Sequence, residues 1–263
     1  MKKAIIYLIE FLAIQFIVGG VIQGVYTLVK GEITADASGP LMVVSTVVSN
    51  LVIIILFLWT RWTPVSVDYV KTRPWGVAFW TILAALGTLL PSVWLQEVLP
   101  ELPNLIEGDL TNIINTPGGY LAVAVAAPVA EEVVFRGAIL RALLSNGRRP
   151  WVAIALSAVF FAVGHLNPAQ MPHAFIIGLL LGWIYYRTGS ILPGVLFHLV
   201  NNTVAYIIER MYPGSDNLTL KDLFGGDERA VMLSVIFSLL ILLPSLFQLH
   251  LRMRSVAQNS VTE

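Results

Sequence analysis

Apolar positions along this chain form long runs that short polar segments separate. Eight runs approach or exceed the length that a helix needs to cross the roughly 30 Å hydrocarbon core of a membrane. The pattern therefore predicts an all-α fold, a polytopic membrane protein with a bundle of about eight transmembrane helices around an intramembrane polar cavity. We expect a single integral membrane domain over residues 1–263. The runs cover residues 4–28, 41–59, 76–99, 119–144, 151–166, 172–186, 191–208 and 230–249, of which the fifth and sixth are short for a full crossing.

Composition supports a chain whose outer surface faces lipid. Hydrophobic residues make up 57% and charged residues 12%, against about 45–50% and 25% in soluble domains. The 16 basic and 16 acidic side chains cancel, which excludes a protein drawn to nucleic acid by net charge and a disordered chain. The sequence holds no cysteine, so disulfides, thiolate nucleophiles and Cys-ligated zinc are excluded.

The distribution of basic residues predicts the orientation. With the N-terminus in the cytoplasm, eleven basic residues fall on the cytoplasmic side and four on the other, as the positive-inside rule requires. Both termini are then cytoplasmic. The first run is too long for a signal peptide and lacks a small-residue cleavage site, so we keep it as a helix. The absence of an organellar transit signal and the compact length favour the plasma (inner) membrane of a bacterium.

The fourth run contains three ionisable side chains within six residues, Glu131, Glu132 and Arg136. Each costs roughly 2.5–3.5 kcal/mol near the centre of a membrane helix unless it is paired or faces a cavity. Glu132 and Arg136 lie four residues apart and can form an ion pair on one face, whereas Glu131 is rotated by about 100°. We therefore assign Glu131 as the reactive carboxylate and Glu132 as the partner of Arg136. A purely structural ion network is the alternative interpretation.

Two later runs carry further polar groups at helical spacing. Phe161 and His165 are four residues apart, as are His198 and Asn202, so each pair shares a helix face. These groups can converge with Glu131 from three helices. Along ideal helices, however, His198 lies about 10 Å from the inner end of its run, and Glu131 and His165 lie about 20 Å from theirs. Taken alone, His165 also fits a packing role, and Asn202 fits a hydrogen bond between helices.

Three other residues need an interpretation. Pro128, three residues before Glu131, removes a backbone hydrogen bond and can open the helix beside the site. His173 lies near a predicted outer end, and we expect it at the membrane interface and outside the site. Glu10 is an intramembrane acid to which the sequence assigns no role.

Taken together, the motifs resemble a known family. Glu-Glu-xxx-Arg at Glu131, Glu132 and Arg136 is followed by Phe-xxx-His and His-xxx-Asn on later membrane helices. This ordered set of seven positions resembles the intramembrane proteases related to the prenyl-protein (CAAX) endopeptidase, grouped with bacterial bacteriocin-processing proteins as the CPBP family. The resemblance covers about residues 120–206, within a motif-bearing core of about residues 119–208.

The resemblance implies hydrolysis of a peptide bond in a membrane-associated protein or peptide. Glu131 would be the general base that activates water, assisted by His165. His198 and Asn202 would stabilise the oxyanion or bind the water. The supporting residues that shape the site would be Glu132, Arg136 and Phe161.

The cofactor stays open, because family members are described both as metalloproteases and as glutamate-dependent enzymes. Zinc, if bound, would use Glu131, His165 and His198, a two-His-one-carboxylate set. The His-Glu-xx-His signature of soluble zinc proteases is absent from the sequence.

Two other functions remain alternatives. Intramembrane acids and histidines also form the pathways of proton-coupled transporters and channels. Against this, the polar groups are gathered on three helices, and no inverted repeat of broken helices is evident. A family member that binds a membrane partner without cleaving it is the second alternative.

Overall fold

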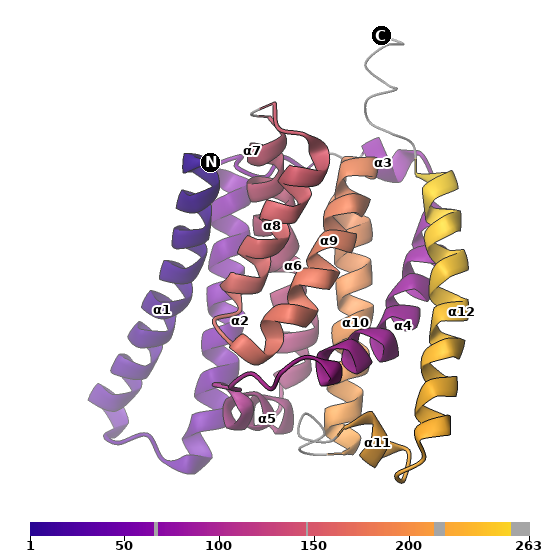
Figure 1. Ribbon diagram of the computed structural model, residues 1–263. Coiled ribbons are helices and arrows are strands. Elements are labelled where there is room, and N and C mark those ends of the chain that lie inside the picture. The colour runs from indigo at the N-terminus through magenta and orange to yellow at the C-terminus, as the bar shows by residue number, and fades with distance from the viewer. Residues whose placement is uncertain (66–67, 146, 213–218, 254–263) are drawn as a thin grey trace.

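The computed structural model describes residues 1–65, 68–145, 147–212 and 219–253, in which all regular secondary structure is helical (Figure 1). The predicted all-α fold is confirmed. The helical elements are α1 (Lys2–Lys30), α2 (Ala35–Trp59), α3 (Asp68–Lys71), α4 (Trp75–Val98), α5 (Glu107–Asn115), η1 (Leu121–Ala126), α6 (Ala127–Glu131), η2 (Glu132–Leu140), α7 (Arg141–Leu144), α8 (Pro150–Gly164), η3 (Pro168–Gln170), α9 (Met171–Thr188), α10 (Leu192–Met211), α11 (Leu220–Leu223) and α12 (Glu228–Arg252).

Among the described helices, α1, α2, α4 and α12 are long and apolar enough to cross a membrane. Their outer faces carry large exposed apolar side chains, such as Phe16 at 67% and Leu28 at 88% on α1 and Phe237 at 62% on α12. Continuous apolar surface of this kind suits contact with lipid. The chain is therefore an all-α membrane protein. The other four predicted spans are also helical, and their crossing of the membrane stays a prediction.

The helices pack mainly in neighbouring pairs. In Figure 1, α1 lies along α2, α8 along α9 and α4 along α12. Helix α10 runs through the bundle and contacts α4, α6, α9 and η1. The start of α1, the end of α12 and the short helix α3 lie at one end of the bundle, whereas α5 and α11 lie at the other (Figure 1).

The centre of the main hydrophobic core is η2. All nine residues of η2 are buried, and Phe135 within it makes edge-on contacts with Phe11 of α1 at 5.2 Å and Phe161 of α8 at 5.1 Å between ring centroids. Phe57 of α2 joins the same cluster. Because η2 is enclosed by three helices, the charged side chains that it carries have little access to lipid or water.

The fourth predicted span follows one helical path, but two parts of it, η1 and η2, are π-helical. The N–H of Ala127 donates to the carbonyl of Ala122, five residues earlier. In η2 the buried hydroxyl of Thr63 donates to the carbonyl of Val133 at 2.6 Å. Turns of this type are frequent at functional sites. The sequence did not predict these π-helical turns. The apolar pattern within one run carries no information about a contact with a residue 70 positions away, such as that between Thr63 and Val133.

Candidate active site

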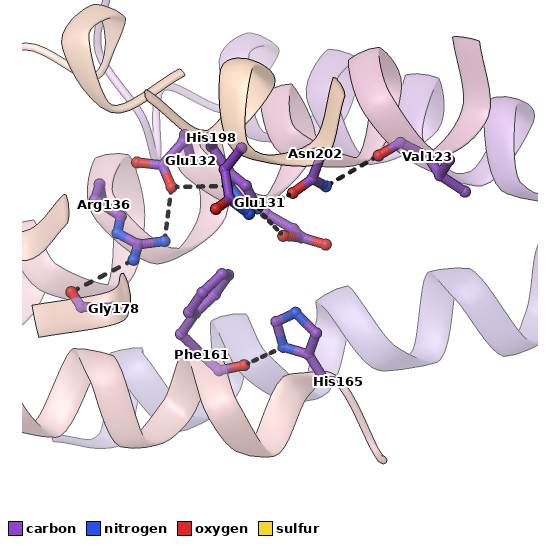
Figure 2. A network of polar contacts seen from close by, with 10 residues as sticks. Val123, Glu131, Glu132, Arg136, Phe161, His165, Gly178, His198 and Asn202 are labelled. Atoms are coloured by element: carbon purple, nitrogen blue, oxygen red, sulfur yellow. Dashed lines mark hydrogen bonds and ion pairs between the residues drawn. The ribbon is translucent and has the colours of Figure 1, made fainter. Parts of the chain in front are cut away.

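The imidazole of His198 on α10 lies between two carboxylates (Figure 2). Its Nε2 is 3.5 Å from Oε2 of Glu131, and its Nδ1 is 3.5 Å from Oε1 of Glu132. Ideal helices placed His198 and the carboxylates at different depths in the membrane, but in the structure these side chains are neighbours. The π-helical turns of η2 account for part of this, because wider turns advance less along the axis per residue. The two helices thus meet where the sequence predicted a common site.

The predicted ion pair between Glu132 and Arg136 is present. Oε1 of Glu132 lies 2.7 Å from Nη1 of Arg136, and the side chains are 0% and 1% exposed. Arg136 also donates from Nη2 to the carbonyl of Gly178 on α9, at 3.4 Å. By contrast, the Glu131 side chain is 17% exposed, and it does not pair with Arg136, which binds Glu132 instead. The charge of Glu132 is therefore compensated, and Glu131 is the more accessible carboxylate.

A glycine on α10 allows this close approach. A Cβ built on Gly194 would lie only 2.5 Å from Oε2 of Glu132. Any larger side chain at this position would push α10 away from η2 or displace the carboxylate. Gly194 lies one helical turn before His198, so it sets how near the imidazole comes to both glutamates. Sequence analysis missed Gly194, although its i, i+4 spacing from His198 was a usable signal.

The ring of Phe161 organises the other side of the site. The guanidinium carbon of Arg136 lies 4.3 Å from the ring centroid, a favourable cation–π arrangement. The same ring makes edge-on contacts with His165 and His198, at 4.8 Å and 5.6 Å between centroids. Phe161 therefore contacts three of the predicted site residues at once and fixes the spacing between the arginine and the two imidazoles.

The hydrogen bond of His165 determines its tautomer. Nδ1 lies 2.8 Å from the carbonyl oxygen of Phe161. A carbonyl oxygen only accepts, so we assign the proton of the neutral ring to Nδ1 and a lone pair to Nε2. In Figure 2 the ring of His165 is turned toward the side of the site where the Glu131 carboxylate lies. Nε2 can therefore accept a hydrogen bond from a water molecule held next to Glu131.

Asn202 binds the backbone of the carboxylate-bearing segment. Its Nδ2 donates to the carbonyl of Val123 in η1 at 3.0 Å. In π-helical spacing this carbonyl would accept from residue 128, but Pro128 has no N–H. The Asn202 amide supplies the donor that the proline lacks. One of its two N–H groups is used in this way, and the other remains for the site.

The candidate zinc ligands do not gather as a metal site. Among the residues that the structure describes, no three His, Asp or Glu side chains are grouped closely enough to hold one metal ion. Glu131 and His198 are neighbours, and the bond of the His165 Nδ1 to a backbone carbonyl leaves its Nε2 free, so the misfit lies in the separation of the three side chains. The arrangement therefore does not fit the set Glu131, His165 and His198 as three ligands of one zinc ion.

The expectation that His173 lies at the membrane interface and outside the site stays a prediction. His173 lies at the start of α9 and is half-buried. Pro168 lies in η3, between α8 and α9, and Pro172 lies in the first turn of α9.

Comparison with known proteins bears on the same segment. Residues 114–204 match the family model of the Rce1-like type II CAAX prenyl endopeptidases. CAAX prenyl protease 2 of Arabidopsis thaliana is 28% identical over 122 residues, which are 39% of this chain and 39% of that protein. The match thus spans about two fifths of the length of the curated relative. No solved structure matches the chain.

The matched segment includes every residue of the three motifs, from Glu131 to Asn202. The same segment forms the enclosed polar cluster around His198. Over residues 114–204, this chain is therefore similar to the Rce1-like type II CAAX prenyl endopeptidases.

Proposed function

We propose that the chain is an intramembrane endopeptidase that hydrolyses a peptide bond with water activated by Glu131. The observation that carries the proposal is the position of His198 between Glu131 and Glu132, 3.5 Å from each. Because Arg136 compensates the charge of Glu132, the second carboxylate is left next to an imidazole in a largely enclosed site. This combination suits general acid–base chemistry.

In the proposed reaction, the Glu131 carboxylate takes one proton from a water molecule as the oxygen attacks the scissile carbonyl carbon. The resulting tetrahedral intermediate carries a negative oxygen. When the intermediate collapses, the carbon–nitrogen bond breaks and the proton on Glu131 passes to the leaving amine. A carboxylic acid and an amine are the products, and Glu131 returns to its starting state.

The neighbouring groups have distinct proposed roles. The Nε2 of His165 accepts a hydrogen bond from the attacking water, since its Nδ1 is held by the Phe161 carbonyl. His198 and the second N–H of Asn202 donate to the developing oxyanion, as donors placed in advance do in other acyl-transfer sites. Glu132, Arg136 and Phe161 hold these groups in place.

The proposed substrate is a membrane-associated protein or peptide. The relative named CAAX prenyl protease 2 and the membrane helices of this chain support a substrate held at the membrane. We further propose a bacterial plasma-membrane location with both termini in the cytoplasm. A transporter would need polar groups along a path, whereas here they surround one imidazole, which favours the hydrolase.

Comparative membrane proteomics tests the proposal in cells. Membranes from cells that carry the wild-type chain or Glu131→Gln are searched for a precursor that accumulates uncleaved. Glu10→Gln is the matched control, because Glu10 is also a carboxylate within a long apolar helix, α1. Loss of a general base lowers a rate by about 10²–10⁴-fold.

We expect precursors to accumulate with Glu131→Gln and not with Glu10→Gln, at equal amounts of protein in the membrane. The same set of membrane peptides in the wild type and Glu131→Gln would contradict the proposal. So would an identical change in both variants, because the effect would then follow from loss of any intramembrane acid.

A further inference from the structure

A cavity lies away from the polar cluster, at the end of the bundle where α1 begins and α12 ends (Figure 1). Its volume is about 960 Å³, at the upper end of the range for small-molecule sites. Residues of α3, of the first turns of α4 and α10, and of the last turns of α9 and α12 line it. In the orientation that we propose, this end faces the cytoplasm.

The charged groups in the lining are mainly basic. Arg73 and Arg252 both line the cavity, and neither forms an ion pair with a described carboxylate. Asp68, the acidic lining residue, is paired with Lys71 at 3.1 Å. The two arginines therefore leave the cavity with uncompensated positive charge, which favours an anionic ligand.

The position of Arg252 is fixed by its neighbours. A Cβ built on Gly76 would lie 3.0 Å from Nη1 of Arg252, so the guanidinium lies over the first turn of α4. Arg187 of α9 donates from Nη2 to the carbonyls of His250 and Met253, at 3.0 Å and 2.6 Å. These bonds tie the end of α12 to α9 and hold Arg252 at the cavity.

Two further features favour an anion. Helices α4 and α10 both begin at the cavity, and helix N-termini carry partial positive charge. The hydroxyl oxygen of Tyr69 is buried and has no hydrogen-bond partner among the described residues. Burial raises the pKa of Tyr69 to about 12, so the group stays a neutral donor at physiological pH and can bond an anionic oxygen.

The rest of the lining suits a hydrocarbon chain. Val65, Val77, Ile191 and Leu192 contribute apolar surface next to the arginines. A ligand that matches both parts has an anionic head and an apolar tail. We propose that this cavity binds an anionic membrane phospholipid, with its phosphate at Arg73 and Arg252 and its acyl chains along the apolar wall. Basic pockets between helices on the cytoplasmic side of membrane proteins bind such head groups.

The test measures lipid binding to the purified, delipidated full-length chain by native mass spectrometry. The probes are dioleoyl phosphatidylglycerol, dioleoyl phosphatidylcholine and free glycerol phosphate. The variant is Arg73→Gln/Arg252→Gln, and the control is Arg149→Gln, which removes an exposed arginine outside the cavity lining. Tyr69→Phe removes one hydroxyl and serves as a milder variant if the double substitution fails to fold.

We expect phosphatidylglycerol to bind more tightly than phosphatidylcholine, and free glycerol phosphate to bind much more weakly than either. Each arginine should contribute about 5-fold to the preference, so the double variant loses about 25-fold. Tyr69→Phe should lose a few-fold, and Arg149→Gln should match the wild type. Equal affinity for the two lipids, or equal loss in Arg149→Gln, overturns the proposal. Glycerol phosphate bound as tightly as the lipid overturns the assignment to a lipid.

Discussion

Removal of one partner from the Glu132–Arg136 pair should destabilise the protein more than removal of both. In Glu132→Gln, the buried guanidinium of Arg136 loses an oxygen at 2.7 Å. It keeps the Gly178 carbonyl at 3.4 Å and the Phe161 ring at 4.3 Å, neither of which carries charge. Leaving one buried charge uncompensated costs about 3–5 kcal/mol. We therefore expect Glu132→Gln and Arg136→Met each to lower the free energy of unfolding by about that amount.

The double variant Glu132→Gln/Arg136→Met removes both charges, so it should be more stable than either single variant. The free energy of unfolding is measured by titration with a denaturing detergent in mixed micelles. Glu131→Gln is the matched control, and it should lose about 1 kcal/mol or less, because that side chain is partly exposed. Wild-type stability in Glu132→Gln with complete loss of cleavage would refute the reasoning and give Glu132 a direct chemical role. Additive losses in the double variant would refute the coupling.

Three further outcomes follow from the geometry. Gly194→Ala should reduce both stability and cleavage, because its Cβ would lie 2.5 Å from Oε2 of Glu132; wild-type values of thermal midpoint and rate would contradict this. Asn202→Ala should lower the free energy of unfolding by about 1–3 kcal/mol, because it leaves the Val123 carbonyl unpaired. The loss should be smaller in a Pro128→Ala background, in which residue 128 regains a backbone N–H. A double-mutant cycle of unfolding free energies measures the difference. Elemental analysis of the purified protein should find less than one zinc per chain, and chelation should leave cleavage unchanged; stoichiometric zinc and loss of activity on chelation would contradict this.

The length of the apolar runs predicted the helical fold, because lipid imposes a simple requirement on sequence. A membrane helix must be apolar over its length, so each of the eight predicted runs corresponds to helical segments of the structure. The ion pair of Glu132 and Arg136 was predictable for a similar reason. Its geometry depends only on spacing within one helix and on the cost of an unpaired charge in a membrane.

Contacts between helices were less accessible to sequence analysis. The motifs indicated that His198 and Glu131 would meet, but ideal helices placed them at different depths. The π-helical turns and the glycine contact of α10 bring them together.

The hydrogen bond of Asn202 is an intermediate case. Its spacing from His198 predicted a shared face, and both residues do lie at the polar cluster. The sequence did not predict that its partner is the carbonyl that Pro128 leaves without a donor. That relation depends on η1 being π-helical, since in an α-helix the proline would leave a different carbonyl unpaired.

The central claim is that Glu131 directs water onto a peptide carbonyl, and isotope labelling tests it most directly. Purified chain in liposomes is given the precursor found by proteomics, in water enriched in oxygen-18, and the products are weighed by mass spectrometry. The wild type and Glu10→Gln should release a fragment whose new carboxyl group carries one oxygen-18 atom, whereas Glu131→Gln should release about 10²–10⁴-fold less. Labelled product from Glu131→Gln at the wild-type rate would contradict the account.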